Sequence, residues 1–236
     1  MWCLLQDDYT MKVEFNCLYW PNSDPLQIKA HKRVTDHFEI PVNYYEEYTP
    51  HGQWMDRVMA NSTSDIVVFF DADCVPIDKI KMLECIKHVQ RTKTFLGITQ
   101  VSNHIPPKTH IYAAPAFYVM TKSCWQQLHT SFAESNRGDV AEEVTYRAEE
   151  LNIRYRCLYP TTFEREPVEG VWPLGNYGYY GVGTTFENTV YHLYQGRMGN
   201  NMQLFAERCE EIVKGRFDNT THFNSKTLDY RGKVVP

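Results

Sequence analysis

The sequence lacks several patterns that would assign the chain to a class at once. It has no apolar run approaching the about 20 residues that span a bilayer, and Met1 to Asp8 do not form a signal-peptide pattern. It contains neither Gly-x-Gly-x-x-Gly, the dinucleotide fingerprint, nor the Gly-Lys-Ser/Thr of a P-loop. We therefore expect a cytoplasmic protein with no transmembrane segment and no dinucleotide cofactor held in that way.

Charge and cysteine spacing exclude further classes. The net charge is −5, 22% of the residues are charged, and no block of Lys and Arg occurs, so we expect no nucleic-acid partner. The seven cysteines are an odd number with no Cys-x-x-Cys spacing, which argues against a disulfide framework and a structural zinc site. We expect them to be small buried residues in a reducing cytosol.

The strongest signal that is present lies between Asp65 and Pro76. Ile66 to Phe70 form a run of β-branched and aromatic residues, which is typical of a strand buried on both faces. Asp71 and Asp73 follow where that strand should end, and ligands in open α/β sheets gather beyond the carboxyl ends of strands. Carboxylates at this spacing can turn toward one cation, and their hard oxygens suit Mg²⁺ or Mn²⁺.

The two aspartates also have a plain structural explanation, in which one caps a helix and the other lies in a solvated turn. The apolar strand before them and Pro76 after them favour the metal site. The segment Phe-Phe-Asp71-Ala-Asp73-Cys-Val-Pro resembles the Asp-x-Asp segment of GT-A-fold glycosyltransferases of the family 2 type. That resemblance implies a divalent ion on the diphosphate of a nucleotide sugar. Both aspartates are then candidate metal ligands, Asp73 the more direct one and Asp71 nearer the ribose or a metal-bound water.

Predicted strands and helices alternate through the first part of the chain. Val13 to Trp20 predicts a strand, and Asp24 and Pro25 suit the cap and first position of the next helix. Ile111 to Met120 predicts another strand, in which Pro115 indicates an edge position or a bend. This alternation predicts an α/β fold with a mainly parallel central sheet flanked by helices. The resemblance implies the Rossmann-like GT-A version of that fold.

The length fits one α/β domain, since such domains often reach this size undivided. We expect residues 1–12 to be a lead-in and residues 13–215 to form the GT-A domain. An amphipathic helix from Met202 to Ile212 closes that domain. Residues 216–236 are polar and predict a poorly ordered tail.

Candidates for contact with the nucleotide precede the Asp-x-Asp segment. Tyr19, next to Trp20, can stack on a pyrimidine or pack into the core. Asp56 and Arg57 lie on the polar face of a predicted amphipathic helix. In GT-A enzymes the corresponding helix contacts the nucleotide, so the resemblance makes Asp56 and Arg57 candidate nucleotide ligands. An ordinary exposed helix face is the alternative.

A second acidic segment begins at Asp139. Apolar residues from Val140 to Leu151 repeat with helical spacing, Asp139 suits the cap, and Glu143 is spaced to pair with Arg147. Structural roles therefore explain these acids. Inverting GT-A transferases also carry an acidic motif at the start of a late helix, where one carboxylate acts as general base on the acceptor hydroxyl. By that resemblance Asp139 and Glu142 are joint candidates for the catalytic base.

The last part of the chain offers further candidates. Residues 172–184 are rich in Gly and Tyr and predict a loop that can close over a ligand or simply cross the surface. His192 lies in a short apolar strand and resembles the histidine that supplies a third metal ligand in many GT-A enzymes, although a lone histidine is more often a core residue. Arg197 can hold a diphosphate oxygen.

These residues together predict a metal-dependent glycosyltransferase that uses a nucleotide-sugar donor, with Mn²⁺ or Mg²⁺ as cofactor. A UDP-sugar is the expected donor. The acceptor can be a glycan, a lipid or a protein. A phosphatase of the haloacid-dehalogenase class is the main alternative, because Asp71-Ala-Asp73 also resembles its nucleophile motif. That class usually places its nucleophile on the first strand, whereas here a strand and a helix precede it. A nucleotide-sugar-binding module without catalysis is the other alternative.

Overall fold

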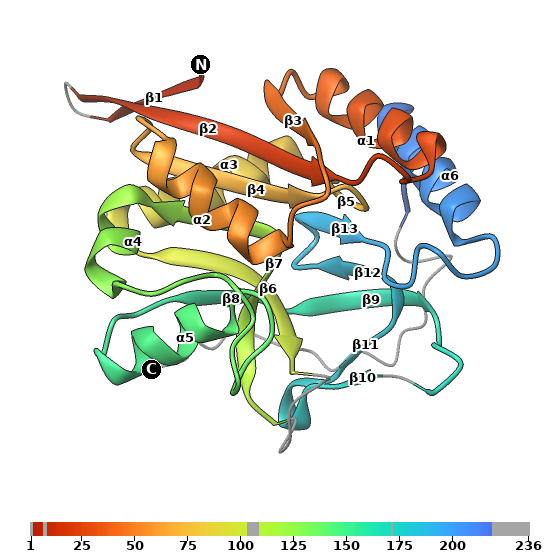
Figure 1. Cartoon of the computed structure of the whole chain (residues 1–236). Coiled ribbons are helices and arrows are strands. Elements are labelled where there is room, and N and C mark those ends of the chain that lie inside the picture. The colour runs from red at the N-terminus through yellow and green to blue at the C-terminus, as the bar shows by residue number, and fades with distance from the viewer. Residues whose placement is uncertain (1, 7–8, 103–108, 171, 219–236) are drawn as a thin grey trace.

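A seven-stranded sheet forms the centre of the described part of the chain (Figure 1). The computed structural model describes every residue except 1, 7–8, 103–108, 171 and 219–236. In order across the sheet the strands are β1 (Trp2–Gln6), β2 (Tyr9–Tyr19), β4 (Ile66–Asp71), β7 (Ile111–Thr121), β6 (Phe95–Val101) and β8 (Arg156–Leu158), and β3 (Val42–Glu46) also pairs with β2.

Most strands of this sheet run in one direction. β3 and β4 are parallel to β2, and β8 is parallel to β6. β7 lies between β4 and β6 and is antiparallel to both, so β6 runs in the direction of β4. β1 is antiparallel to β2. The predicted α/β fold with a mainly parallel central sheet is therefore confirmed.

The core is built on β4, whose apolar run is fully buried, as its composition predicts. Ile66, Val68 and Phe70 belong to the apolar cluster on one face of the sheet. Val67 and Phe69 belong to the cluster on the opposite face. Because both faces of β4 are packed, the strand delivers Asp71 to the edge of the sheet from a rigid support.

Helices cover both faces of the sheet (Figure 1). α3 (Lys79–Thr92) packs on the face of Ile66 through its buried stripe of Met82, Cys85, Ile86 and Val89. The opposite face is covered by α2 (His51–Asn61), α4 (Lys122–Leu128) and α5 (Glu142–Glu150). No helix of the described residues is long and apolar enough to cross a membrane.

A second sheet of four antiparallel strands continues from the chain that leaves β4. In order, its strands are β5 (Cys74–Pro76), β13 (Val190–His192), β12 (Val182–Phe186) and β9 (Pro160–Arg165). α6 (Asn201–Val213) and α1 (Pro25–His37) share an apolar cluster with Val75 and Tyr191 of this sheet. The small sheet is thereby fixed to the main body.

The small sheet corrects the prediction of a loop over residues 172–184. That stretch contains β10 (Trp172–Pro173), β11 (Tyr179–Tyr180) and the start of β12. Gly183 has a φ of +70° and a Cβ there would lie 2.9 Å from both the Glu164 carboxylate and the Tyr191 hydroxyl. Gly183 is therefore required for close packing inside a strand. In the sequence, a glycine that serves such packing looks the same as a glycine of a flexible loop.

Several local predictions can be compared directly. Asp24 caps α1 as expected, its side chain accepting a hydrogen bond from Leu26 N. Of the two alternatives for Pro115, the edge position is wrong, because β7 lies between β4 and β6. The bend agrees with the structure, since the register skips from Tyr118 to Ala114 opposite Gly97 and Ile98 and the proline lies in that irregularity. Residues 2–6 of the lead-in form β1. Of the predicted tail, residues 219–236 lie outside the described residues.

The cysteine prediction is confirmed for the residues whose side chains are described. These cysteines are all free and buried, which is what small apolar residues of a core do. They are Cys17, Cys74, Cys85, Cys124, Cys157 and Cys209.

Gly52→Ala should lower the free energy of unfolding by about 2 kcal/mol, a typical cost of overpacking. An added Cβ would lie 2.3 Å from the carbonyl oxygen of Phe132 and 2.5 Å from Cα of Ala133, and backbone cannot yield as a flexible side chain does. Urea denaturation measures the loss. Gln53→Ala, exposed on the same helix, is the matched control, expected to change stability by less than about 0.5 kcal/mol. Equal effects of the two changes would contradict this close packing.

Candidate functional site

Asp71 and Asp73 lie in the turn between the end of β4 and the first strand of the small sheet. β4 ends at Asp71, and Asp73 immediately precedes β5. β5 pairs antiparallel with β13, which places Cys74 opposite His192. The backbone oxygen of Asp73 accepts a hydrogen bond from Leu193 N at 2.9 Å. This pairing brings a histidine from far along the chain to the aspartates.

Asp71, Asp73 and His192 form a candidate metal site. Each contributes a ligand atom, and these atoms all lie within 4.8 Å of one another. His192 Nε2 lies 3.3 Å from Asp73 Oδ1, and the carboxylates of Asp71 and Asp73 are 29% and 22% exposed, against 7% for His192. His192 Nδ1 is buried without a hydrogen-bond partner among the described residues. Two carboxylates and an imidazole that open toward solvent suit Mn²⁺ or Mg²⁺.

His51 also reaches this site, and sequence reasoning missed it. Its Nε2 lies 3.4 Å from Asp71 Oδ1, and its ring stacks on Trp54 with centroids 5.6 Å apart. Burial raises the pKa of Asp71; His51 opposes that increase, and the charge of Asp73 adds to it. The available signal was position, because His51 is the first residue of α2, directly after the loop that leaves β3. Strand ends and helix starts meet at this edge of the sheet.

A buried histidine, His31, packs against the end of β4 next to the candidate metal site. His31 of α1 is fully buried, and its Nδ1 is hydrogen-bonded with the Tyr44 hydroxyl at 2.8 Å. Its ring packs against Phe70 at the end of β4, with centroids 5.9 Å apart. Burial lowers the pKa of His31 to about 4, so the ring is neutral at pH 7. His31 therefore adds no positive charge that could compete with a cation above it.

A cleft of about 880 Å³ opens beside the aspartates, a volume that suits a nucleotide-sized ligand. One wall is the end of β2 with the turn that follows it, and the other is the segment from Gln195 to Met202. Tyr19 lines the first wall and donates its hydroxyl to Glu46 at 3.2 Å. Trp20 is 38% exposed, which leaves part of its ring available to a ligand.

Arg197 spans this cleft. Its guanidinium lies over the Trp20 ring, 5.0 Å from the centroid, so the two walls touch through a cation–π contact. A Cβ added at the preceding Gly196 would lie 3.5 Å from Asp73 Oδ2. The backbone of this segment therefore passes close to the candidate metal ligands, and Arg197 is within the same cleft.

Asp56 and Arg57 lie elsewhere. Asp56 accepts hydrogen bonds from the Ser131 hydroxyl and from Phe132 N, and so fixes the chain that follows α4. Arg57 forms an ion pair with Glu47 and lines a separate small pocket. Neither residue lines the cleft beside Asp71. Both have structural partners, as expected for a polar helix face.

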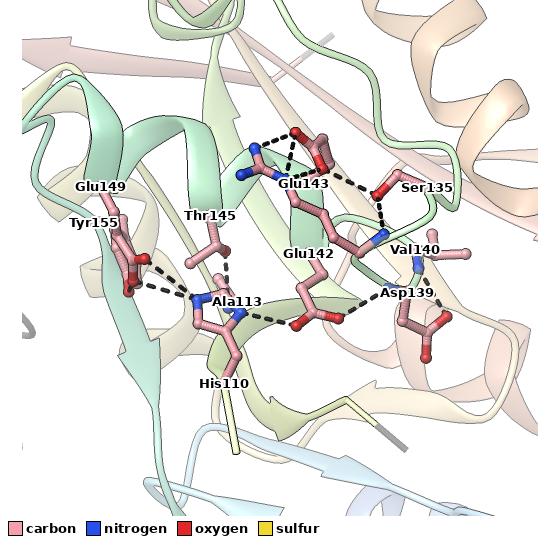
Figure 2. Close-up of polar contacts among 11 residues, drawn as sticks. His110, Ala113, Ser135, Asp139, Val140, Glu142, Glu143, Thr145, Glu149 and Tyr155 are labelled. Carbon is pink, nitrogen blue, oxygen red and sulfur yellow. Dashed lines mark hydrogen bonds and ion pairs between the residues drawn. The ribbon is translucent and has the colours of Figure 1, made fainter. Parts of the chain in front are cut away.

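The acidic segment at α5 differs in detail from its prediction (Figure 2). The helix begins at Glu142, and its cap position is Ala141, which has a φ of +66°. The assignment of Asp139 as cap is therefore wrong; its Oδ1 accepts a hydrogen bond from Val140 N at 2.7 Å, within the turn before the helix. The predicted pair of Glu143 with Arg147 is also wrong. Glu143 binds Arg137 and Arg147 binds Glu150, because the turn brings Arg137 over the helix start.

Buried tyrosines interact with each of the two acidic groups. Burial raises the pKa of the Tyr112 hydroxyl, and the negative charge of Asp139 raises it further. Burial likewise raises the pKa of Tyr194, with contributions from Tyr180, Tyr112 and Asp71. The rings of Tyr180 and Tyr194 lie 5.2 Å apart.

The contribution of His110 to stability should decrease as the pH rises. Burial alone lowers the pKa of His110, but hydrogen bonds to Glu142 and Glu149 outweigh it and raise the value from 6.5 to about 8. Because the pKa is higher in the folded protein than in the unfolded chain, protonated His110 stabilises the fold by about 2 kcal/mol below pH 6.5. This stabilisation is lost as the pH rises through 8. The stability difference between the unaltered chain and His110→Gln, measured by urea denaturation from pH 6 to 9, should shrink accordingly. His37→Gln on the surface is the control, and a difference that stays constant with pH would contradict the expectation.

Comparison with known proteins gives fold similarity alone. No protein-family model matches this chain, and no curated protein does. A Drosophila β-1,4-galactosyltransferase 7 mutant, solved with manganese, UDP-Gal and xylobiose, is similar with 10% identity over 78% of this chain and 72% of that one, with a TM-score of 0.42. A CMP-2-keto-3-deoxy-manno-octonic acid synthetase in complex with CTP has 11% identity over 62% and 88%, and a TM-score of 0.41. A glycosyltransferase involved in glycosylation of the PBCV-1 major capsid has 13% identity over 48% and 60%, and a TM-score of 0.32.

Proposed function

We propose that this protein is a metal-dependent glycosyltransferase that takes its sugar from a nucleoside-diphosphate sugar, with a UDP-sugar as the favoured donor. The observation that carries the proposal is the convergence of Asp71, Asp73 and His192 at the rim of a cleft large enough for a nucleotide. A diphosphate carries negative charge that carboxylates repel unless a divalent ion lies between them. The three metal-ligand side chains would therefore allow a diphosphate to bind in the cleft beside two carboxylates.

The remaining groups of the cleft fit the other parts of such a donor. Trp20 and Tyr19 offer aromatic surface to a nucleobase, and a base that stacks on Trp20 would take the place of Arg197. Arg197, once released, can bind a diphosphate oxygen with its guanidinium. His51 holds the Asp71 carboxylate near the point where the ribose would lie. These roles extend from one wall of the cleft to the other.

Transfer requires a leaving diphosphate and a deprotonated acceptor. Asp71, Asp73 and His192 would hold a divalent ion, which would supply Lewis-acid stabilisation of the charge on the leaving diphosphate. On the other side, Asp139 and Glu142 are the acids from which a general base can come. A glycan, a lipid or a protein can supply the acceptor hydroxyl.

Two features of the site disfavour a phosphatase of the haloacid-dehalogenase class. The strand that carries Asp71 is preceded by β2 and β3 in the sheet, whereas that class usually places its nucleophile on the first strand. No lysine is among the described residues that line the cleft, so the lysine partner expected beside an aspartyl nucleophile of that class is absent from that lining. A binding module without catalysis shares the donor site and differs from the proposal only in turnover.

Adding UDP with Mn²⁺ should raise the melting temperature by about 5 °C or more at a ligand concentration near 100 Kd, and EDTA should abolish the shift. Asp73→Asn should remove most of the metal-dependent part, because it removes one ligand charge without changing the side-chain shape. Glu84→Gln, an exposed acid on α3, is the control expected to keep the full shift. GDP and CDP, with Mn²⁺ or Mg²⁺, are compared in the same assay.

Different outcomes separate the alternatives. Slow release of UDP from a UDP-sugar, lost in Asp73→Asn, supports a transferase, while nucleotide binding without turnover supports a binding module. Hydrolysis of p-nitrophenyl phosphate without any nucleotide-dependent shift would support a phosphatase. Failure of all three nucleoside diphosphates to stabilise the protein with either metal would refute the proposal.

Arg197→Ala should weaken UDP binding about 10-fold, the loss expected for a charge-assisted hydrogen bond to a phosphate. Isothermal titration of the metal-loaded protein measures this change. Arg197→Lys should recover part of the affinity, since a lysine keeps the charge but not the bidentate geometry. Arg91→Ala, exposed at the end of α3, controls for the loss of one positive charge. Equal losses for Arg197 and Arg91 would indicate a general charge effect.

A further inference from the structure

A second pocket lies beside the cleft and shares a wall with it. Its volume is about 660 Å³, which suits a small organic ligand. Tyr19 and Trp20, at the end of β2 and just after it, line both spaces. Much of the remaining lining comes from the outer face of α1, where Lys29, Lys32 and Arg33 recur at helical spacing. We call this space the α1 pocket.

The two neighbouring spaces differ in the sign of their charge. Besides His51, the charged residues that line the cleft are three aspartates and one arginine. The α1 pocket is lined by three cationic and two acidic side chains, Lys29, Lys32, Arg33, Asp36 and Glu46. The aspartates of the cleft repel an anion unless a divalent ion lies between them, whereas the α1 pocket carries an excess of positive charge of its own. An anion can therefore enter the α1 pocket without a metal ion.

Lys29 and Lys32 are the cations of the α1 pocket that remain available to a ligand. Arg33 is held by Glu210 of α6, with its Nε 2.7 Å from the carboxylate. Both lysines are exposed, and neither forms an ion pair with a described residue. Lys32 Nζ lies over the Tyr44 ring, 4.7 Å from its centroid, a contact that still leaves N–H groups for an acceptor. Because the two lysines are one helical turn apart, both ammonium groups can reach one carboxylate.

The two acids of the α1 pocket limit the charge that a ligand can bring. Glu46 accepts a hydrogen bond from the Tyr19 hydroxyl at 3.2 Å. Asp36 lies one turn beyond Lys32 on α1 and forms no ion pair with a described residue. Since three cations face these two acids, the lining suits a ligand with a single negative charge. A nucleoside diphosphate carries more negative charge than this lining offsets.

The rest of the α1 pocket is largely apolar. Trp20 is 38% exposed, and Pro21, Pro25 and Ile28 add ring and aliphatic surface to the lining. An aromatic or aliphatic body that covers this surface removes apolar area from water, its own and that of the protein. A ligand that matches the whole lining therefore combines one negative charge with an apolar body.

We propose that the α1 pocket is a second ligand site, separate from the cleft, which binds a small organic carboxylate with an aromatic or aliphatic body and needs no metal ion. Lys29 and Lys32 bind the carboxylate, and the body packs on Trp20 and its apolar neighbours. The candidate metal ligands do not line this pocket, so the inference does not depend on the proposed function. Because Tyr19 and Trp20 belong to both spaces, a ligand in the α1 pocket lies against the wall that the cleft uses.

Isothermal titration with phenylacetate in the presence of EDTA tests this site, because EDTA excludes binding that requires a divalent ion. Acetate and glucuronate lack the apolar body, and benzyl alcohol lacks the charge. Each should bind about 10-fold or more weakly than phenylacetate, and the glucuronate arm distinguishes a sugar acid from an apolar acid. Raising KCl to about 0.5 M should weaken the binding of phenylacetate, since salt screens exposed charges.

Two changes of opposite sign test the charges of the pocket. The double variant Lys29→Gln/Lys32→Gln should weaken phenylacetate binding about 10-fold or more, because it removes both charge-assisted contacts. Asp36→Asn should strengthen it about 2-fold, because it removes an acid from the same helix face. Lys87→Gln/Arg91→Gln, which removes two exposed cations from α3, is the matched control and should bind phenylacetate as the unaltered protein does. The melting temperature without ligand checks that each variant folds.

Three results would overturn the inference: no binding of phenylacetate up to about 10 mM, binding no tighter than that of acetate, or equal weakening in the two double variants. The proposed function is tested separately. Lys29→Gln/Lys32→Gln should keep the melting-temperature shift caused by UDP and Mn²⁺, and Asp73→Asn should keep phenylacetate binding. Phenylacetate binding in a protein that gives no shift with UDP and Mn²⁺ would support the α1 pocket and count against the proposed function.

Discussion

The pairing of β5 with β13 is the contact on which the rest of the site depends. It is short, only three residues on each strand, but the hydrogen bond from Leu193 N to Asp73 O fixes the turn and the register together. A slip of one residue would turn His192 away from the aspartates, because neighbouring side chains of a strand face opposite sides. The small sheet, α1 and α6 share an apolar cluster that holds this register. The candidate metal site is thus a product of packing remote from it.

The electrostatics of the site follow from where the positive groups lie. Asp71 and Asp73 are near each other at the edge of the sheet, and their protein partners are two imidazoles, His51 and His192, with no Lys or Arg as an ion-pair partner among the described residues. Full charge compensation by the protein would leave nothing for a cation to neutralise. At the turn before α5 the arrangement is the reverse, since Glu143 and Glu142 both bind cationic or proton-bearing groups of the protein. The charges of Asp71 and Asp73 are therefore left for a bound ion to neutralise, whereas Glu142 and Glu143 already have partners within the protein.

The sequence predicted the features that depend on neighbouring residues. The apolar run before Asp71 indicated a strand buried on both faces, and Asp24 was recognisable as a cap, because both features depend on local patterns. The short strand around His192 was recognised as β13, but its sheet was not predicted, since β5 and β12 are too short for periodicity and Gly183 looks like a loop residue. His51 and His110 were missed for a similar reason: their partners, Asp71 and Glu142, are supplied by tertiary packing. The cap assigned to Asp139 failed because the chain takes an extra turn through Ala141 before the helix begins.

The two acidic groups of the chain are held by different kinds of contact. Asp71 stands at the carboxyl end of β4, which is buried on both faces and tolerates little displacement. The turn before α5 is held by a few hydrogen bonds among Asp139, Glu142 and His110. Because these two sets of contacts share no residue, a substitution that disturbs the turn before α5 can leave the packing of β4 intact.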